Sequence, residues 1–188
     1  MSVLAAQDLV SIEEYLKGEL VSEQKHEYLG GIVHAMAGGS TRHNTISVNA
    51  LVTLANKLAG SACRPFNSDM KIKLTLQNQI RFYYPDVHVT CQPTENHETY
   101  QDQPCVIVEV LNPSTQRIDQ GEKREAYLAI PSLQTLILLD QDRIYAHVDQ
   151  RSSPLGFERC FYQAAEDEIP LPSLDTSITL GDLYQGAL

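Results

Sequence analysis

The sequence predicts an α/β domain in which helices flank a mixed, curved sheet. Segments with the alternating or continuous apolar pattern of strands recur through the chain, and two stretches with helical spacing are preceded by capping residues. A chain of 188 residues can bury roughly 70% of its unfolded surface, so it needs no disulfide or structural metal to fold. We expect one domain over 1–188, with an N-terminal helix and hairpin at 11–37, a core at about 40–165 and a docked tail at 166–188.

A short helix and a hairpin are expected near the N-terminus. Ser11 begins a capping-box pattern, which predicts a helix over about 12–17 that ends at Gly18. Gly30-Gly31 separates two strand-like runs and predicts a hairpin over 25–37.

Two longer helices and a series of strands are expected beyond the hairpin. The first helix runs from Ser40 or Thr41 to about Ala59, and the second follows Pro113 and covers about 115–129. The expected strands are 62–66, 70–76, 85–91, 105–111, 134–140, 143–149 and 157–163. Leu and Tyr side chains in 178–184 are expected to dock the tail on the body.

Composition indicates a cytoplasmic protein with no membrane segment. The chain has 43% hydrophobic and 20% charged residues, and no apolar run approaches the roughly 20 residues of a membrane span. The four cysteines are far apart and form no C-x-x-C pair. Cys91 and Cys105 lie in apolar or alternating runs, where a free cysteine behaves as a small hydrophobe. We therefore expect reduced cysteines.

The formal net charge of −10 bears on nucleic-acid binding. Proteins that bind DNA tightly and nonspecifically usually present a basic face, because phosphate contacts supply most of the affinity. The charge argues against such binding, but it is compatible with a local basic stripe or with carboxylates neutralised by bound metal ions.

Two carboxylates are placed to act together. Asp86 follows Pro85 at the start of a predicted strand, and Glu109 is the one charged residue in the apolar run 105–111. An ionised carboxylate in a strand covered on both faces is costly unless a cation meets it. Two carboxylates at neighbouring strand ends repel each other, and a divalent cation such as Mg²⁺ or Mn²⁺ relieves the repulsion. Spacing alone equally permits a turn aspartate and a glutamate paired with a Lys or Arg.

A larger set of residues resembles a known nuclease family. Pro85-Asp86, followed by Glu109-Val110-Leu111 at the end of an apolar strand, resembles the PD-(D/E)XK nuclease superfamily. The block from Glu109 to Thr115, with Asp119, Lys123 and Tyr127, is more closely similar to the Uma-type restriction endonuclease family. Glu27 before a Gly-Gly hairpin turn, and His43 at the start of a long helix, also match the pattern of that family. The resemblance extends from about Ser11 to Tyr184.

The resemblance implies a restriction-endonuclease-like fold and metal-assisted hydrolysis of phosphodiester bonds. It assigns Asp86 and Glu109 as ligands of Mg²⁺ or Mn²⁺, with the Val110 carbonyl as a third ligand, and Glu27 as an auxiliary acid. A nucleic acid, DNA in our expectation, is then the substrate. A homodimer is expected because cutting two strands needs two sites. The alternative for Glu27 is an exposed charge on a hairpin strand.

The motif lysine of the superfamily is missing, since Leu111 stands two residues after Glu109. Residues Thr115, Asp119, Lys123 and Tyr127 recur every four positions in the predicted helix and form one stripe. If that stripe faces the strand ends, Lys123 supplies the missing ammonium. The alternative is a surface pair of Asp119 and Lys123, and a second function, a binding or regulatory module that does not cleave, stays open beside the enzyme.

Two histidines and two lysines are weaker candidates for the site. A local structural role is favoured for His43 and a packed one for His88. Lys71 and Lys73 share a strand face that we expect to be solvated.

Overall fold

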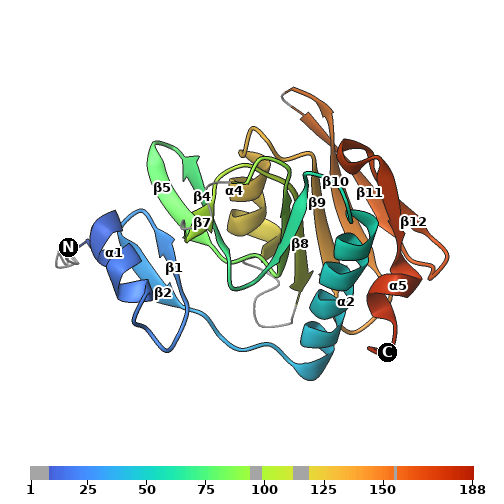
Figure 1. Cartoon of the computed structure of the whole chain (residues 1–188), viewed down its shortest axis with the longest axis horizontal. Coiled ribbons are helices and arrows are strands. Elements are labelled where there is room, and N and C mark those ends of the chain that lie inside the picture. The colour runs from blue at the N-terminus through green and yellow to red at the C-terminus, as the bar shows by residue number, and fades with distance from the viewer. Residues whose placement is uncertain (1–8, 94–98, 112–118, 155) are drawn as a thin grey trace, which may run out of the picture.

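The computed structural model describes residues 9–93, 99–111, 119–154 and 156–188. Its centre is a six-stranded sheet of order β11-β10-β9-β8-β6-β3 (Figure 1). The strands are β3 (Arg64–Asn67), β6 (Val87–Thr90), β8 (Pro104–Leu111), β9 (Thr135–Asp140), β10 (Ala146–Ser153) and β11 (Gly156–Tyr162). Strands β8 and β9 are parallel, and every other neighbouring pair in this sheet is antiparallel.

A second, five-stranded sheet has the order β2-β1-β5-β4-β7. Its strands are β1 (His26–Leu29), β2 (Ile32–Ala35), β4 (Lys71–Leu76), β5 (Gln79–Tyr83) and β7 (Tyr100–Gln101). The predicted hairpin is confirmed, because β1 and β2 pair antiparallel around Gly30 and Gly31, which both have positive φ. Strand β5 was not expected. It pairs with both β1 and β4 and so links the hairpin to the rest of the sheet.

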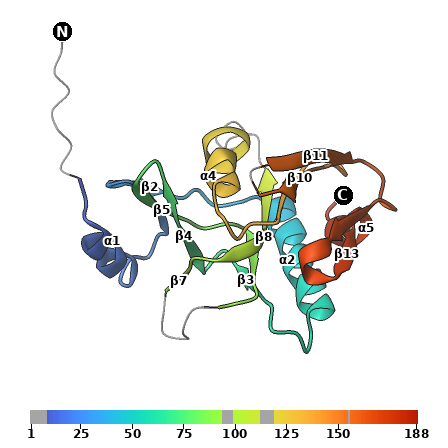
Figure 2. The same cartoon turned by 90° about the horizontal axis from the view of Figure 1, so that it is seen from above.

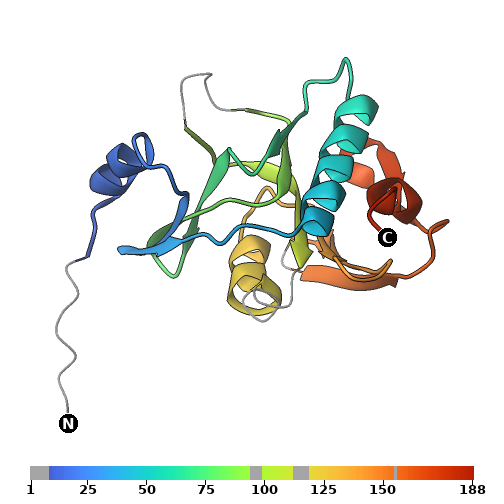
Figure 3. The ribbon, with the colours of Figure 1, turned by 90° about the horizontal axis from the view of Figure 1, so that it is seen from below.

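Helices cover both faces of the six-stranded sheet. Helix α2 (Thr41–Lys57) lies on one face, and α4 (Arg124–Leu128) lies on the other (Figure 3). Valines from β6 and β8 point toward α2, with which they form one apolar core. Residues Ile107 and Leu111 of β8 point the opposite way and pack with α4 and with side chains of β4 and β5. This alternation places Glu109, between Ile107 and Leu111, on the α4 face.

The N-terminal helix α1 (Ile12–Glu19) begins with the predicted capping box between Ser11 and Glu14. It continues one residue past Gly18, where it was expected to end. Tyr15 of α1 packs against Tyr28 and Phe82 of the five-stranded sheet, with ring centroids 5.0 and 5.4 Å away. Figures 1 and 2 show α1 at the opposite end of the molecule from the C-terminal helix α5 (Leu180–Tyr184).

The C-terminal tail docks as predicted. Strands β12 (Glu168–Leu171) and β13 (Thr176–Thr179) form a separate antiparallel pair with a 3-10 turn, Pro172–Leu174, between them. Side chains of β13 and α5 are buried in the core beneath α2. The tail therefore completes the main core of the molecule.

Three expectations need correction. The predicted helix over 115–129 begins, within the described part of the chain, with a π-helical turn at Asp119–Lys123, and only Arg124–Leu128 is α-helical. Cys63 and Cys91 form a disulfide, so the expectation of reduced cysteines is wrong for this pair, which the fold brings together across β3 and β6. The strand expected at 143–149 runs instead over 146–153, after the turn that follows β9.

No helix in the described part of the chain has the length and apolar character needed to cross a lipid bilayer. The division of the whole chain into a single domain stays a prediction.

Candidate active site

A buried carboxylate, that of Glu109, is the centre of the site. Glu109 is 5% exposed near the end of β8. Its Oε1 accepts a hydrogen bond of 2.6 Å from the Tyr127 hydroxyl and lies 3.0 Å from Lys123 Nζ. The cost of burying this charge is therefore offset by a cation and a phenol donor, both from the segment that includes α4.

Lys123 joins Glu109 to Glu27. The ammonium is 3.1 Å from Glu27 Oε1 of β1, and the residue is 7% exposed. The nitrogen also lies over the Tyr83 ring, 5.8 Å from its centroid. A surface pair with Asp119 is thus not the environment of Lys123, which is buried between strands of both sheets.

Two ion pairs hold the residues on either side of Lys123. Glu122 accepts a 2.7 Å hydrogen bond from Arg81 of β5, and Arg124 donates two 2.7 Å bonds to Asp149 of β10. Lys123 ends the π-helical turn, a form that occurs frequently at functional sites. The flanking pairs fix this turn to both sheets and so direct the ammonium between the carboxylates.

Asp86 lies just before β6 and is held by two other groups. Its Oδ2 accepts a 2.7 Å bond from the backbone N–H of Val110 and lies 3.2 Å from His43 Nε2. Val110 follows Glu109 directly, so this bond attaches Asp86 to the same stretch of β8. His43 is in the first turn of α2, and Gly39 allows the ring to approach because a Cβ there would lie 2.7 Å from Nδ1.

The charges at the site favour a cation. The described side chains supply three carboxylates, Glu27, Asp86 and Glu109, and one ammonium, Lys123. Glu27 Oε1 is buried, and the nearby ammonium does not meet it with hydrogen-bond geometry. Carboxylate oxygens of this kind suit Mg²⁺ or Mn²⁺.

The described residues contain no group of three His, Cys, Asp or Glu side chains arranged to hold a metal ion. Mg²⁺ usually keeps several waters and takes only one or two carboxylates, so an Mg²⁺ site does not require three such side chains. Their joint coordination of a metal, with the Val110 carbonyl, stays a prediction.

A pocket of about 610 Å³ opens beside Asp86 and His43. It is bounded by the N-terminal end of α2 and by residues on both sides of the β1–β2 hairpin. Hydroxyl and amide side chains of α2 line it, together with Glu23 and with Lys25, whose ammonium is paired with Asp69. The pocket therefore offers donors for an anionic ligand next to Asp86.

The structure brings Glu27, Glu109 and Lys123 into contact and attaches Asp86 through the backbone of Val110. A local structural role was favoured for His43, but its ring contacts Asp86 and so lies at the site. The sequence signal for this contact was the position of His43 in the first turn of a long helix. Leu111 is buried in the apolar core on the α4 face and places no charge at the site.

Two of the weaker candidates, His88 and Lys71, are buried and have structural roles. His88 is fully buried and stacks on Phe66, and burial lowers its pKa to about 3, so the ring is neutral and packed as expected. Lys71 is buried, and its ammonium donates to the Tyr84 hydroxyl, so the solvated face expected for Lys71 is wrong. Thr115, the first residue of the predicted stripe, lies outside the described residues.

Comparison with known proteins is consistent with the geometry. The family model Uma2, described as "Putative restriction endonuclease", matches residues 12–181. The uncharacterized Synechocystis protein slr1290 is 36% identical over 178 residues, 94% of this chain and 92% of that protein. A second uncharacterized Synechocystis protein, sll1609, is 31% identical over 144 residues, 75% of this chain and 80% of that protein.

A solved structure has the same fold. It is described as a "putative nuclease belonging to DUF820" from Anabaena variabilis, and it matches with a TM-score of 0.72 at 19% sequence identity. The match covers 95% of this chain and 99% of that chain. The predicted fold class, an α/β nuclease-like fold with mixed sheets flanked by helices, is thereby confirmed.

Proposed function

The chain belongs to the Uma2 family of restriction-endonuclease-like proteins, and on that premise we propose that it is a Mg²⁺- or Mn²⁺-dependent endonuclease that hydrolyses phosphodiester bonds of DNA. The family membership supports a hydrolase acting on phosphodiester bonds. The metal, the DNA substrate, a homodimeric assembly and a cytoplasmic location are the finer parts of the proposal.

One observation carries the proposal: Lys123 lies between Glu27 and Glu109, and the N–H of Val110, the residue after Glu109 on β8, donates a hydrogen bond to Asp86. A buried ammonium within 3.1 Å of two carboxylates is costly to assemble for stability alone. Hydrolysis of a phosphodiester uses such an arrangement, because carboxylates hold a metal ion and an ammonium stabilises charge that develops on the phosphoryl oxygens.

Each residue then has a role in the reaction. A metal ion bound by Asp86 and Glu109 would polarise a phosphoryl oxygen and lower the pKa of the attacking water. Lys123 stabilises the charge of the transition state from its position beside Glu109. Glu27 orients that ammonium and, with its buried Oε1, can accept a hydrogen bond from the attacking water. His43 and the Val110 N–H orient the Asp86 carboxylate.

The pocket beside Asp86 supports a nucleic-acid substrate. Lys25 and the hydroxyl side chains at the start of α2 can donate hydrogen bonds to phosphate oxygens, and the N-terminal end of a helix favours negative charge. Because the whole chain carries a net charge of −10, we expect the affinity for DNA to be low without divalent cations and to fall with added salt.

A second candidate function is a DNA-binding or regulatory module that no longer cleaves. The apolar Leu111 at the position of the motif lysine favours it, as does the acidic total charge. In this alternative the contacts of Lys123 with Glu27 and Glu109 stabilise the fold only.

The deciding experiment is a cleavage assay on plasmid and single-stranded DNA with Mg²⁺, Mn²⁺ or EDTA. The wild type should cut only with a metal, and Asp86→Ala should not cut. Asp102→Asn, a change at an exposed aspartate away from the site, should cut like the wild type. If the wild type binds DNA in a gel-shift assay but does not cut it with either metal, the non-cleaving module is the function.

A further inference from the structure

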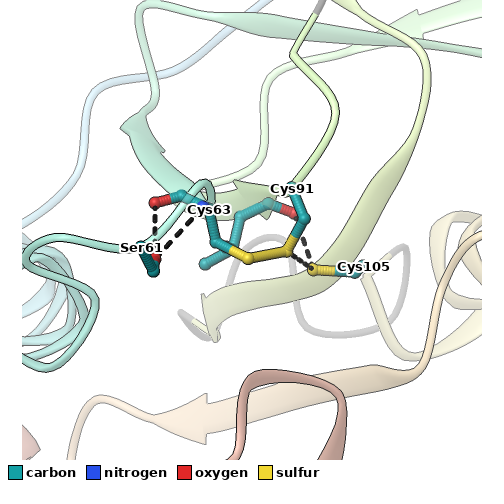
Figure 4. The surroundings of a disulfide bond; sticks show 5 residues. Ser61, Cys63, Cys91 and Cys105 are labelled. Carbon is teal, nitrogen blue, oxygen red and sulfur yellow. Dashed lines mark hydrogen bonds between the residues drawn. A yellow bond between two sulfur atoms is a disulfide. The ribbon is translucent and has the colours of Figure 1, made fainter.

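A cluster of three cysteine sulfurs lies at the opposite end of β6 from Asp86. Cys63, before β3, is disulfide-bonded to Cys91, which follows β6. The sulfur of Cys105 on β8 lies 3.7 Å from the Cys91 sulfur. Figure 4 shows the Cys105 sulfur beside Cys91, on the side away from Cys63.

A bulge explains why Cys105 faces this pair. The register between β6 and β8 shifts between Val89 and Thr90, which pair with Val106 and Pro104, so Cys105 is the extra residue on β8. Bulges re-aim side chains, and here both Cys105 and its neighbour Val106 pack on the core beneath α2, as does Cys63. All three sulfurs are thereby held on one side of the sheet.

We propose that Cys91 is shared between two alternative disulfides, Cys63–Cys91 and Cys91–Cys105, which interconvert by intramolecular thiol–disulfide exchange. The Cys105 thiolate attacks the Cys91 sulfur, the Cys63–Cys91 bond breaks, and Cys63 leaves as a thiolate. The proton lost by Cys105 is balanced by the proton that Cys63 takes up. No electrons are gained or lost, so the exchange needs no external oxidant.

The exchange changes which strands are cross-linked. The Cys63–Cys91 bond ties the turn before β3 to the end of β6, whereas a Cys91–Cys105 bond joins β6 to β8. Strand β6 begins directly after Asp86, and β8 carries Glu109. Burial raises the pKa of the Cys105 thiol to about 11, so little of the attacking thiolate is present at neutral pH and the exchange should be faster at alkaline pH.

The geometric part of the proposal is tested with two serine variants of the full chain. In Cys63→Ser, oxidised glutathione should convert Cys91 and Cys105 to a disulfide, with release of two molecules of reduced glutathione. In the matched control Cys91→Ser, Cys63 and Cys105 should form their bond more than about tenfold more slowly, because the Cys105 sulfur lies on the side of residue 91 away from Cys63. Peptide mapping by mass spectrometry, after alkylation of free thiols, reads both results.

The proposal is overturned if the Cys63→Ser protein has the circular dichroism of the wild type, carries glutathione on Cys91 and Cys105, and forms no Cys91–Cys105 disulfide. The wild type gives a second test that does not depend on a variant's folding. Native protein incubated with iodoacetamide should accumulate alkylated Cys63 together with a pair of peptides joined by a Cys91–Cys105 disulfide. If Cys105 is alkylated while Cys63–Cys91 stays intact, the exchange does not occur. The exposed Cys160 reports that alkylation has proceeded.

Discussion

At the scale of single residues, the proposed enzyme and the binding module differ in the role that each gives to Lys123. Its ammonium is within 3.1 Å of two carboxylates from different sheets, while the expected lysine position holds Leu111. A cation has therefore been supplied from the helix side of the site instead of from β8. Its value for catalysis depends on stabilising the transition state more than the ground state.

Lys123→Ala should lower kcat for DNA cleavage by about 10²–10³, the typical cost of losing one such donor. Lys123→Arg should recover little, because a planar guanidinium does not replace a compact ammonium. Rates of plasmid cleavage with Mn²⁺ measure both. The control is Lys17→Ala, which removes an exposed lysine paired with Glu13 and should leave the rate unchanged.

Arg124, the next residue along the chain, is unsuitable as a control for Lys123. Its guanidinium makes two bonds to the buried Asp149, so its removal should destabilise the protein. If Lys123→Ala cleaves DNA at the wild-type rate, the contacts of Lys123 serve the structure only.

Glu109 is the residue whose removal tests metal binding apart from cleavage. Mn²⁺ should raise the Tm of the wild type, because a ligand that binds only the folded state stabilises it by about 2.7 kcal/mol at 100 times its Kd. Glu109→Gln should abolish this rise, and Glu158→Gln, at an exposed glutamate of β11, should retain it. Thermal unfolding with and without Mn²⁺ gives the comparison. A full metal response in Glu109→Gln would remove Glu109 from the metal site.

At the scale of elements, the π-helical turn and α4 depend on an ion cluster beneath them. Asp149 on β10 is 1% exposed and contacts Arg124, Arg159 and His147 within 3.3 Å. Burial raises its pKa, but hydrogen bonds from His147 and Arg124 outweigh burial and hold the pKa well below its usual value. This carboxylate anchors the residue that follows Lys123 to the six-stranded sheet.

Asp149→Asn should destabilise the protein by about 3–5 kcal/mol at pH 7, because it leaves Arg124 without its buried partner. A carboxylate with a depressed folded pKa contributes stability above its unfolded pKa of 3.8, and this contribution is lost as the pH falls toward the folded pKa. Stability of the wild type should therefore fall more steeply below about pH 4 than that of the variant.

Urea unfolding of both proteins from pH 7 to pH 3 makes this measurement. Parallel curves for wild type and variant through the acid range would show that Asp149 does not set the acid sensitivity. The control is Asp102→Asn, whose exposed carboxylate should leave stability within about 0.5 kcal/mol of the wild type at pH 7.

At the scale of the whole molecule, the two ends of the chain have different relations to the main core. The helix α1 packs on the five-stranded sheet through an aromatic cluster of its own. The C-terminal tail instead fills the core beneath α2, where Ile178, Leu180, Leu183 and Tyr184 are buried. The stability of the nuclease-like body should therefore depend on the tail.

Leu183→Ala should cost about 2–5 kcal/mol of unfolding free energy, because Leu183 is fully buried and the change leaves a cavity. Leu188→Ala is the matched control, since that leucine is 53% exposed and its loss should cost less than about 0.5 kcal/mol. Denaturant unfolding at pH 7 compares them. Equal stabilities would mean that the tail is peripheral to the core.

The sequence by itself determined the features that depend on local pattern. The capping box at Ser11, the Gly30-Gly31 hairpin and the helix after Ser40 are each decided by residues close together in the chain, and all three are present. The apolar run around Glu109 likewise predicted a buried strand with one charge in it. Periodicity and capping act over a few residues, so they can be read without the fold.

Only the tertiary structure decided how distant groups meet. Glu27 contacts Lys123 across 96 positions of sequence numbering, and His43 contacts Asp86 across 43, because β1, α2 and the π-helical turn converge on β8. The Cys63–Cys91 bond depends equally on the pairing of β3 with β6. Such contacts depend on packing and on the pairing of buried charges, which no local sequence pattern records. The sequence shows which residues are charged, but only the fold determines which of them meet.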